Sequence, residues 1–352
     1  MTKVSRHIPS LDGLRAISFL LVFVAHCGLD QYVPGGLGVT IFFFLSGFLI
    51  TTLMRAEFQS NGAVNFRHFW LRRAFRILPP FYIVLVAGIA AALIFDPPGT
   101  LSGPAVAAQL LHVTNYWMIY RGIDGQPAGT GVYWSLAVEE HFYLLFPWFY
   151  VGMQKLRLPP FKQALCLWIL CGLVLVWRYI LVYHFHVTMD RTYVATDTRM
   201  DSILFGCALA VWHNPVLDEL NLNERRWKYI VVPSAVLVFV ICLLFRGSEF
   251  RETVRYSLQG AALTFVFIAA IKFPTWMPFR VLNLRPMAFI GLLSYSLYLL
   301  HFAVIIGVQR LTPGWGAGWQ SVLSFLVSMG LAWVMYLTVE KPFARLRRQL
   351  SD

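Results

Sequence analysis

The chain has 352 residues, of which 58% are hydrophobic and 13% are charged, and its formal net charge is +12. Apolar runs of about twenty residues recur from end to end, which excludes an ordinary soluble domain and predicts an all-α bundle of transmembrane helices. The basic residues lie in short connections between these runs, without clustering on a polar face, so we expect no nucleic-acid partner.

The cysteines argue against a disulfide framework and against a metal site. Their number is odd, all lie in or beside apolar runs, and none has the paired spacing of a zinc or disulfide motif. We therefore expect the protein to bind no metal. The cysteines are Cys27, Cys166, Cys171, Cys207 and Cys242.

Hydropathy predicts about ten membrane spans. A further apolar stretch, 105 to 120, contains several polar side chains, and we expect it to be interfacial or re-entrant, with an eleventh span as the alternative. The approximate ranges of the ten spans are 11 to 29, 36 to 54, 79 to 95, 132 to 151, 163 to 184, 200 to 213, 229 to 245, 256 to 272, 287 to 309 and 319 to 339.

The distribution of lysine and arginine sets the predicted orientation. With ten spans and the N-terminus inside, most of these residues fall in internal segments, as is usual for membrane proteins. We therefore expect both termini to be cytoplasmic, whereas an eleventh span at 105 to 120 would remove the bias. No internal repeat or long polar stretch is evident, and the chain is expected to form a single integral membrane domain over residues 1–352.

The first span, SLDGLRAISFLLVFVAHCGL, carries two ionisable residues that hydrocarbon should exclude, Arg15 and His26. Eleven helical steps of about 100° bring them to nearly the same face, about 16 Å apart along the axis. In membrane helices such residues usually face a cavity or a partner, and a neutral imidazole accepts a proton near neutral pH. We expect His26 to be a general base, with a packing histidine as the alternative. Arg15 could pair with Asp12 and either meet a phosphate or extend to the lipid headgroups.

The connection after the second span contains FWLRRAFRILPP, which places Arg72, Arg73 and Arg76 near one turn of an amphipathic helix. Guanidinium groups bind phosphate bidentately, so this cluster suits a polyphosphorylated co-substrate at the cytoplasmic mouth. Contact with anionic lipid is the alternative. Within the second span, Ser46 and Gly47 interrupt an aromatic run, and we expect them to let another helix approach closely.

The fourth span begins WSLAVEEHFYLLFP, so that Glu139 and Glu140 enter the membrane next to a histidine. The two carboxylates point about 100° apart, and at most one of them can meet a given partner. We expect one to orient His26, as carboxylates orient catalytic imidazoles. A structural ion pair with Arg178 or Arg199 is the alternative.

Several polar and aromatic residues lie at the external ends of spans or on inward faces. Hydrogen bonds and ring stacking from such residues could hold a sugar, although aromatic residues near an interface are more often anchors. The expected substrate-binding residues are Tyr133, Trp134, Ser135, Arg199, Asp201, Tyr298 and His301, with Asp197 beside them.

Six stretches together resemble, in order, the motifs of acyltransferase family 3: SLDGLRAISFLLVFVAHCG, FFFLSGFLITTLM, FWLRRAFRILPPFY, YWSLAVEEHFYLLFP, RMDSILFG and SYSLYLLHF. The resemblance covers nearly the whole chain. Where the family commonly has Gln after the two glutamates, this chain has His141. The positions that match the motifs are Arg15, His26, Arg72, Arg73, Arg76, Glu139, Glu140, Arg199, Asp201, Tyr298 and His301.

This resemblance implies an enzyme that moves an acyl group, commonly acetyl, from a cytoplasmic acyl-CoA to a hydroxyl of a carbohydrate or glycolipid. It implies His26, Glu139 and Glu140 as catalytic residues and Arg15 with the arginine cluster as the acyl-CoA site. A location among the lipids of a bacterial inner membrane is expected.

Other function classes stay open. A transporter or flippase is one alternative, and an acyltransferase for a small antibiotic-like acceptor is another. Thioester hydrolysis by the purified protein would separate an enzyme from a transporter. The acceptor, the acyl group and the oligomeric state do not follow from the sequence.

Overall fold

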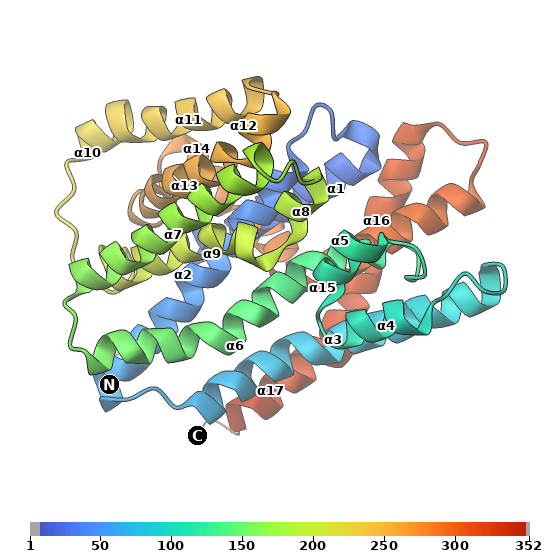
Figure 1. The fold of residues 1–352 in the computed structure, drawn as a ribbon, viewed down its shortest axis with the longest axis horizontal. Helices are drawn as coiled ribbons and strands as arrows, with labels where there is room; N and C mark the ends of the chain where they lie inside the picture. Colours follow the sequence, from blue (N-terminus) through green and yellow to red (C-terminus); the bar gives the residue numbers. More distant parts are fainter. Residues whose placement is uncertain (1–7, 350–352) are drawn as a thin grey trace. The chain divides into compact units, whose positions relative to one another are not determined.

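The computed structural model describes residues 8–349, and these residues form helices and connecting loops without a strand (Figure 1). The chain ends, which are predicted to be cytoplasmic, lie outside this range. In chain order the elements, with short π or 3-10 turns labelled η, are α1 (Pro9–Val24), η1 (Ala25–Leu29), α2 (Gly35–Asn61), α3 (Phe66–Phe95), α4 (Gly103–Leu110), α5 (Thr114–Arg121), η2 (Thr130–Tyr133), α6 (Trp134–Lys155), α7 (Pro160–Tyr183), α8 (Met189–Val194), α9 (Thr196–Val211), α10 (Glu224–Arg226), η3 (Trp227–Val231), α11 (Val232–Leu244), α12 (Ser248–Glu252), α13 (Val254–Lys272), α14 (Met277–Leu282), α15 (Arg285–Leu311), α16 (Ala317–Met335), η4 (Tyr336–Glu340) and α17 (Lys341–Gln349).

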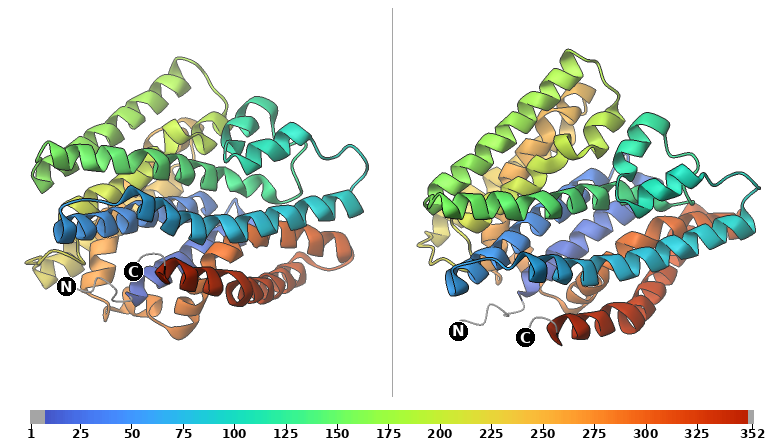
Figure 2. Two further views of the ribbon diagram at one scale, coloured as in Figure 1. Left: turned by 90° about the horizontal axis from the view of Figure 1, so that it is seen from below. Right: turned by 60° about the horizontal axis from the view of Figure 1, so that its bottom comes forward.

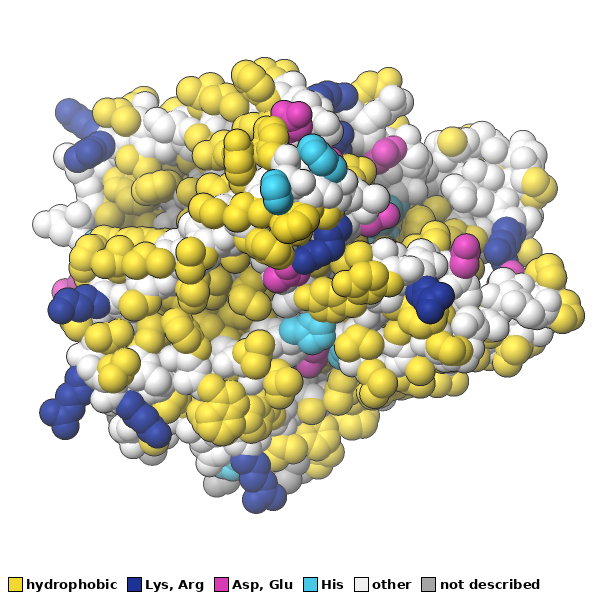
Figure 3. Space-filling model, in the orientation of Figure 1, with side chains coloured by type: hydrophobic (Ala, Val, Ile, Leu, Met, Phe, Trp, Pro, Cys, Tyr) yellow, Lys and Arg dark blue, Asp and Glu magenta, His cyan; other side chains and the backbone are white. Residues whose placement is uncertain are grey.

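Among the described residues, eight helical segments are long and apolar enough to cross a membrane, which confirms the all-α, multi-pass class. Hydrophobic side chains cover most of the face shown in Figure 3. At the end of α3, for example, Leu93, Ile94 and Phe95 are 72%, 72% and 78% exposed. An apolar surface of this kind belongs in lipid, because soluble proteins rarely expose large apolar patches.

Two of the ten predicted spans are not among these eight. The helix α6 has 22 residues, but Glu139 and Glu140 in its first half lower its hydropathy. The helix α9 has 16 residues, which at 1.5 Å per residue gives about 24 Å, less than the hydrocarbon thickness of about 30 Å. The exact number of spans stays a prediction.

The stretch from 105 to 120 does not form a continuous span. It consists of α4 and α5, each of 8 residues and hence about 12 Å long (Figure 1). Between them, His112 adopts a left-handed φ of 55°, which ends the first helix and turns the chain. Neither helix is long enough to cross a membrane, which agrees with an interfacial or re-entrant segment.

Contacts divide the chain into two compact units. Unit 1 consists of Met1–Ser18, Gly36–Val64 and Leu144–Gly291, and unit 2 of Phe19–Gly35, Asn65–Tyr143 and Leu292–Asp352. The single domain expected over residues 1–352 stays a prediction.

In unit 1, α2 and α9 cross in backbone contact. A Cβ atom on Gly47 would lie 2.1 Å from the carbonyl oxygen of Ile203, and one on Gly206 would lie 2.0 Å from that of Phe44. Only glycine fits at either position, because any side chain would overlap the neighbouring backbone. The packing role predicted for Gly47 is confirmed.

In unit 2, α17 runs alongside the first half of α3 (Figures 1 and 2). The rings of Phe75 and Phe343 hold the two helices together, with their centroids 6.0 Å apart. The hydroxyl of Tyr295 donates to the carbonyl oxygen of Ile77 at 2.7 Å and ties α15 to α3.

Candidate functional site

The leading site in unit 2 is a pair of imidazoles, His26 and His301. His26 lies in η1, and His301 lies near the middle of α15. Nδ1 of His26 is 2.9 Å from Nε2 of His301, and the two rings are stacked with centroids 5.1 Å apart. His301 is fully buried and His26 half-buried. The two histidines, for which the sequence predicted separate roles, are therefore hydrogen-bonded to each other.

The backbone determines which nitrogens of this pair carry protons. Nδ1 of His301 lies 2.9 Å from the carbonyl oxygen of Tyr298, which can only accept, so this nitrogen donates. In the neutral ring Nε2 of His301 is then an acceptor, and Nδ1 of His26 must donate to it. The proton positions follow from this network and leave an unprotonated Nε2 on His26. Such a nitrogen can accept a proton from a hydroxyl.

Aromatic rings enclose the pair. Phe302 stacks on His26 with ring centroids 4.5 Å apart, and Phe19 meets the ring of His301 edge-on at 5.8 Å. These rings present no hydrogen-bond acceptor in their planes that could compete for the imidazole protons. Hydrogen bonds in such a low-dielectric setting are stronger than in water, so the relay is held in one arrangement.

The turn η1 positions His26. Its five residues form a π-helical turn, with a φ of 88° at Gly28, and π turns are frequent at functional sites because they redirect side chains. The prediction that Arg15 shares a face with His26 assumed an α-helix throughout, and it stays a prediction. Arg15 itself, in unit 1, forms the expected ion pair with Asp12.

The beginning of α6 is attached to α15 close to His301. The hydroxyl of Tyr133 donates to the carbonyl oxygen of Leu299 at 3.3 Å, and the hydroxyls of Ser135 and Tyr298 are 2.7 Å apart. These three hydroxyl-bearing side chains and that of Trp134 are buried. The structure thus brings these predicted residues together, while their role in binding substrate stays a prediction.

Both glutamates of α6 lie near Arg73 of the arginine cluster. Glu139 accepts a hydrogen bond from the hydroxyl of Tyr143 at 3.0 Å, and the guanidinium of Arg73 lies 5.7 Å from the centre of that tyrosine ring. Helical spacing explains the pairing, because residues four apart share a face. Nδ1 of His26 is hydrogen-bonded to His301, and the orientation of His26 by a carboxylate stays a prediction. A catalytic role for Glu139 and the half-buried Glu140 stays a prediction.

The predicted arginine cluster lies on the first half of α3. Arg72 and Arg73 are half-buried and Arg76 is exposed, and the charged groups around Arg73 include Glu139 and Arg347 of α17. The sequence did not indicate Arg347, because only the packing of α17 along α3 brings it to the cluster.

The sequence reasoning also missed Glu340. Its carboxylate accepts a hydrogen bond from Ser296 at 2.5 Å, and Arg76 is a neighbouring charge. Glu340 ends the π turn η4 within the last apolar helical segment. The predicted span stopped at residue 339, one position short of it. The sequence feature that could have indicated Glu340 is an acidic residue at the end of an apolar run.

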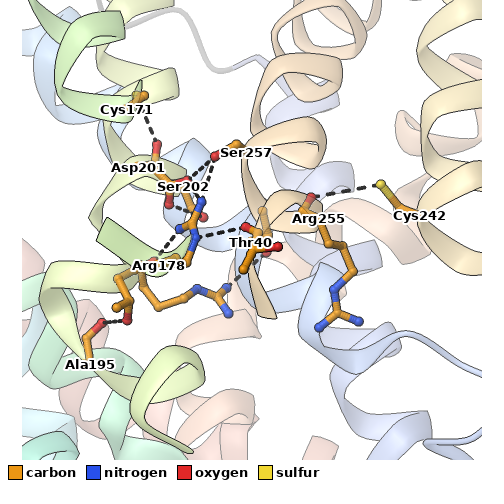
Figure 4. A network of polar contacts seen from close by, with 12 residues as sticks. Thr40, Cys171, Arg178, Ala195, Asp201, Ser202, Cys242, Arg255 and Ser257 are labelled. Carbon is orange, nitrogen blue, oxygen red and sulfur yellow. Dashed lines mark hydrogen bonds and ion pairs between the residues drawn. The ribbon is translucent and has the colours of Figure 1, made fainter. Parts of the chain in front are cut away.

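Asp201 belongs to a buried polar network in unit 1 with Arg178 and Ser257 (Figure 4), and Arg199 is buried in the same unit. Asp201 forms an ion pair with Arg178 at 2.6 Å, and both side chains are fully buried. Arg199 donates to the hydroxyl of Thr40 at 3.1 Å and lies 4.0 Å from the centre of the Tyr256 ring. The ion pair that Arg178 forms is thus with an aspartate of the same unit. Substrate binding by Arg199 and Asp201 stays a prediction.

Comparison with known proteins agrees with the motifs. The model of a family described as an acyltransferase domain matches residues 8–337. The chain is 32% identical to "Putative peptidoglycan O-acetyltransferase YrhL" of Bacillus subtilis, over 97% of this chain and 55% of that protein. It is 31% identical to peptidoglycan O-acetyltransferase OatA of Listeria monocytogenes, over 98% of this chain and 57% of that protein.

The chain thus spans just over half the length of the curated relatives it matches. No solved structure matches it. On the match of the family model over most of its length, the chain belongs to acyltransferase family 3, the family that its ordered motifs resemble.

Proposed function

We propose that this protein is a multi-pass membrane O-acyltransferase that transfers an acyl group, acetyl in the simplest case, from acyl-CoA to a hydroxyl of a carbohydrate. The observation that carries the proposal is the hydrogen-bond relay from the carbonyl of Tyr298 through His301 to His26. Family membership supports acyl transfer, and the names of the relatives suggest peptidoglycan as the acceptor. The bacterial plasma membrane is the proposed location.

In the proposed step, Nε2 of His26 accepts the proton of the acceptor hydroxyl as its oxygen attacks the thioester carbonyl carbon. A C–O bond forms, the C–S bond of the tetrahedral adduct breaks, and the leaving thiolate takes the proton from His26 to give free CoA. While His26 is positively charged, Nε2 of His301 accepts from its Nδ1 and stabilises the charge, as the third group of a catalytic triad does.

The donor would be held by the arginine cluster. The phosphates of CoA suit the guanidinium groups of Arg72, Arg73 and Arg76, because arginine binds phosphate bidentately. Glu139, through Tyr143, would then position Arg73 and would act on the donor side of the reaction. The contribution predicted for Arg15 is part of the same proposal.

The test of acyl transfer uses the purified protein in lipid nanodiscs with acetyl-CoA labelled in its acetyl group. The acceptor is the disaccharide of N-acetylglucosamine and N-acetylmuramic acid. We expect free CoA, detected with a thiol reagent, to appear together with a labelled O-acetyl ester, detected by mass. A transporter would release no CoA, and the absence of both products would refute the proposal.

The donor site is tested by binding. We expect Arg73→Gln and Arg76→Gln each to weaken acetyl-CoA binding about tenfold, in line with the loss of one charged hydrogen-bond partner. Arg225→Gln is the matched control, because Arg225 is an exposed arginine in α10 of unit 1. If Arg73→Gln and Arg76→Gln bound acetyl-CoA as tightly as Arg225→Gln, the cluster would serve only to orient the chain in the membrane.

A further inference from the structure

The bent segment formed by α4 and α5 contains buried polar atoms that have no hydrogen-bond partner among residues 8–349. They are one amide atom of Gln109, Nε2 of His112 and Nε1 of Trp117. Gln109 is fully buried, and exchanging the assignment of its amide oxygen and nitrogen would still leave one atom unpaired. Buried polar groups are nearly always paired, so three such atoms within nine residues indicate a bound polar group.

The protonation of His112 sets the chemistry of that group. Its Nδ1 lies 3.2 Å from the carbonyl oxygen of Gln109 and must donate to it. Burial, with His141 as a second cause, lowers the pKa of His112 to about 4, so the ring is neutral at pH 7. Its unpaired Nε2 is then an acceptor, while Nε1 of Trp117 is a donor. A hydroxyl group both donates and accepts, and can therefore pair with either of these atoms.

The segment is held in its bent form by polar contacts that leave these atoms free to bind. The amide nitrogen of Gln109 donates to Gln126 at 2.9 Å and to Thr130 at 2.6 Å. The backbone of His112, at its left-handed φ of 55°, is a hydrogen-bond partner of the His141 ring. A non-glycine residue in this conformation is uncommon, and such strain persists where the surroundings impose it. The segment is thus preorganised.

Two contacts bring the segment next to the imidazole pair. Thr130, which accepts a hydrogen bond from Gln109, is the first residue of η2. The residue before it, Gly129, has a φ of 79° and lies against α15, because a Cβ atom there would be 2.4 Å from Cα of Ala303. Ala303 follows Phe302, the ring that stacks on His26.

The second contact runs through Phe81. Its ring centroid lies 4.6 Å from that of His112 and 5.2 Å from that of Tyr133. Tyr133 in turn donates to the carbonyl of Leu299, two residues before His301. A chain of contacts through Phe81 and Tyr133 therefore links the bent segment to the helix that carries His301.

We propose that the α4–α5 segment is the subsite for a second hydroxyl-bearing part of the sugar acceptor, with Gln109, His112 and Trp117 as its hydrogen-bonding residues. The identity of the ligand as a sugar rests on the proposed function. The subsite would fix the sugar while another of its hydroxyls meets His26.

The experiment measures binding of the N-acetylglucosamine and N-acetylmuramic acid disaccharide to the full chain in nanodiscs by calorimetry, without any donor. Two variants remove one unpaired atom each. His112→Asn keeps an amide nitrogen where Nδ1 was, tolerates the left-handed backbone and lacks a counterpart of Nε2. Trp117→Phe keeps an aromatic ring and lacks Nε1. The matched control is Trp319→Phe, because Trp319 is 71% exposed in α16.

We expect the dissociation constant of the disaccharide to rise roughly fivefold in His112→Asn and in Trp117→Phe, as the loss of one neutral hydrogen bond predicts, and to stay unchanged in Trp319→Phe. His112→Gln, whose amide nitrogen or oxygen can reach the place of Nε2, should restore part of the affinity. Acetyl-CoA affinity should be the same in all variants.

The outcomes separate this inference from the proposed function. Unchanged disaccharide binding in both variants, or no binding by the unaltered protein, would overturn the subsite. Loss of binding in the variants would support it even if the unaltered protein transferred no acetyl group, which would refute the proposed function alone. Melting temperatures within about a degree of the unaltered protein serve to show that the variants are folded.

Discussion

Arg178 in unit 1 and the imidazole pair in unit 2 are hydrogen-bonded in different ways. In unit 1, Arg178 donates to Asp201, to Ser257 at 2.7 Å and to the carbonyl of Thr253 at 3.0 Å, while Ser257 also donates to Asp201 (Figure 4). All of these contacts lie within the protein. In unit 2, the hydrogen-bond relay from the carbonyl of Tyr298 through His301 ends on the half-buried His26, whose Nε2 is left as an acceptor.

This difference indicates a structural role for the Arg178 network and a chemical role for the imidazole pair. A buried charge whose hydrogen bonds are all made within the protein fixes the packing of the helices that carry it. A relay that is fixed at one end and open at the other can hand a proton to a ligand. We therefore expect changes in the unit 1 network to act on stability and changes in the imidazole relay to act on turnover.

The largest effect should come from removing the open end of the relay. We expect His26→Ala to lower kcat about 10²- to 10⁴-fold, because that is what a general base contributes, with little change in melting temperature. The measurement is CoA release by the purified variant. His184→Ala is the control, since His184 is an exposed histidine in unit 1. Full activity of His26→Ala would rule out the base assignment.

The next effect concerns the buried network of Arg178 and Asp201 in unit 1. Asp201→Asn should lower the free energy of unfolding by about 3–5 kcal/mol, because it leaves Arg178 buried without its counter-ion. The double variant Arg178→Met with Asp201→Leu should recover much of that loss. Denaturant titration in detergent gives the values. Asp96→Asn is the control, because its partner Arg310 is 54% exposed in its side chain and the pair should contribute less than about 1 kcal/mol. Equal losses in Asp201→Asn and Asp96→Asn would contradict the structural role.

A smaller effect is expected at the middle of the relay. His301→Phe keeps a ring but removes the acceptor for Nδ1 of His26, so we expect kcat to fall on the order of 10²-fold while the affinity for acetyl-CoA stays constant. His301→Gln, which offers an amide oxygen, should recover part of the rate. If His301→Phe and His301→Gln were equally active, the ring would serve packing only.

The smallest effect is a pH dependence in unit 1. Burial raises the pKa of Asp197, but hydrogen bonds from Arg191 and Trp177 outweigh it and leave the pKa below its ordinary value. A depressed carboxyl pKa stabilises the fold above the unfolded value of about 3.9, and this contribution is lost as pH falls through the folded value. Because the group is partly exposed, we expect less than about 1 kcal/mol.

The check is the stability difference between the unaltered protein and Asp197→Asn from pH 7 to pH 3. It should be constant at the upper end and shrink below about pH 4 as the carboxyl is protonated. A difference that grew on acidification would contradict the assigned direction.

The sequence by itself determined the class of the protein and most of its local features. Apolar runs predicted the membrane helices, the spacing of Arg15 and Asp12 predicted their ion pair, and Gly47 in an aromatic run predicted a close helix crossing. These features depend on composition or on residues within one helical turn. Ordered motifs also indicated the family.

Only the tertiary structure decided which distant residues meet. His26 and His301 are separated by 275 positions, and nothing in either motif shows that they share a hydrogen bond. The π turn η1, the packing of α17 along α3 and the bend at His112 likewise depend on contacts between elements. The physical reason is that hydropathy and helical periodicity describe one helix at a time. The partner of a polar side chain is set by which helices pack together, and that depends on the whole chain.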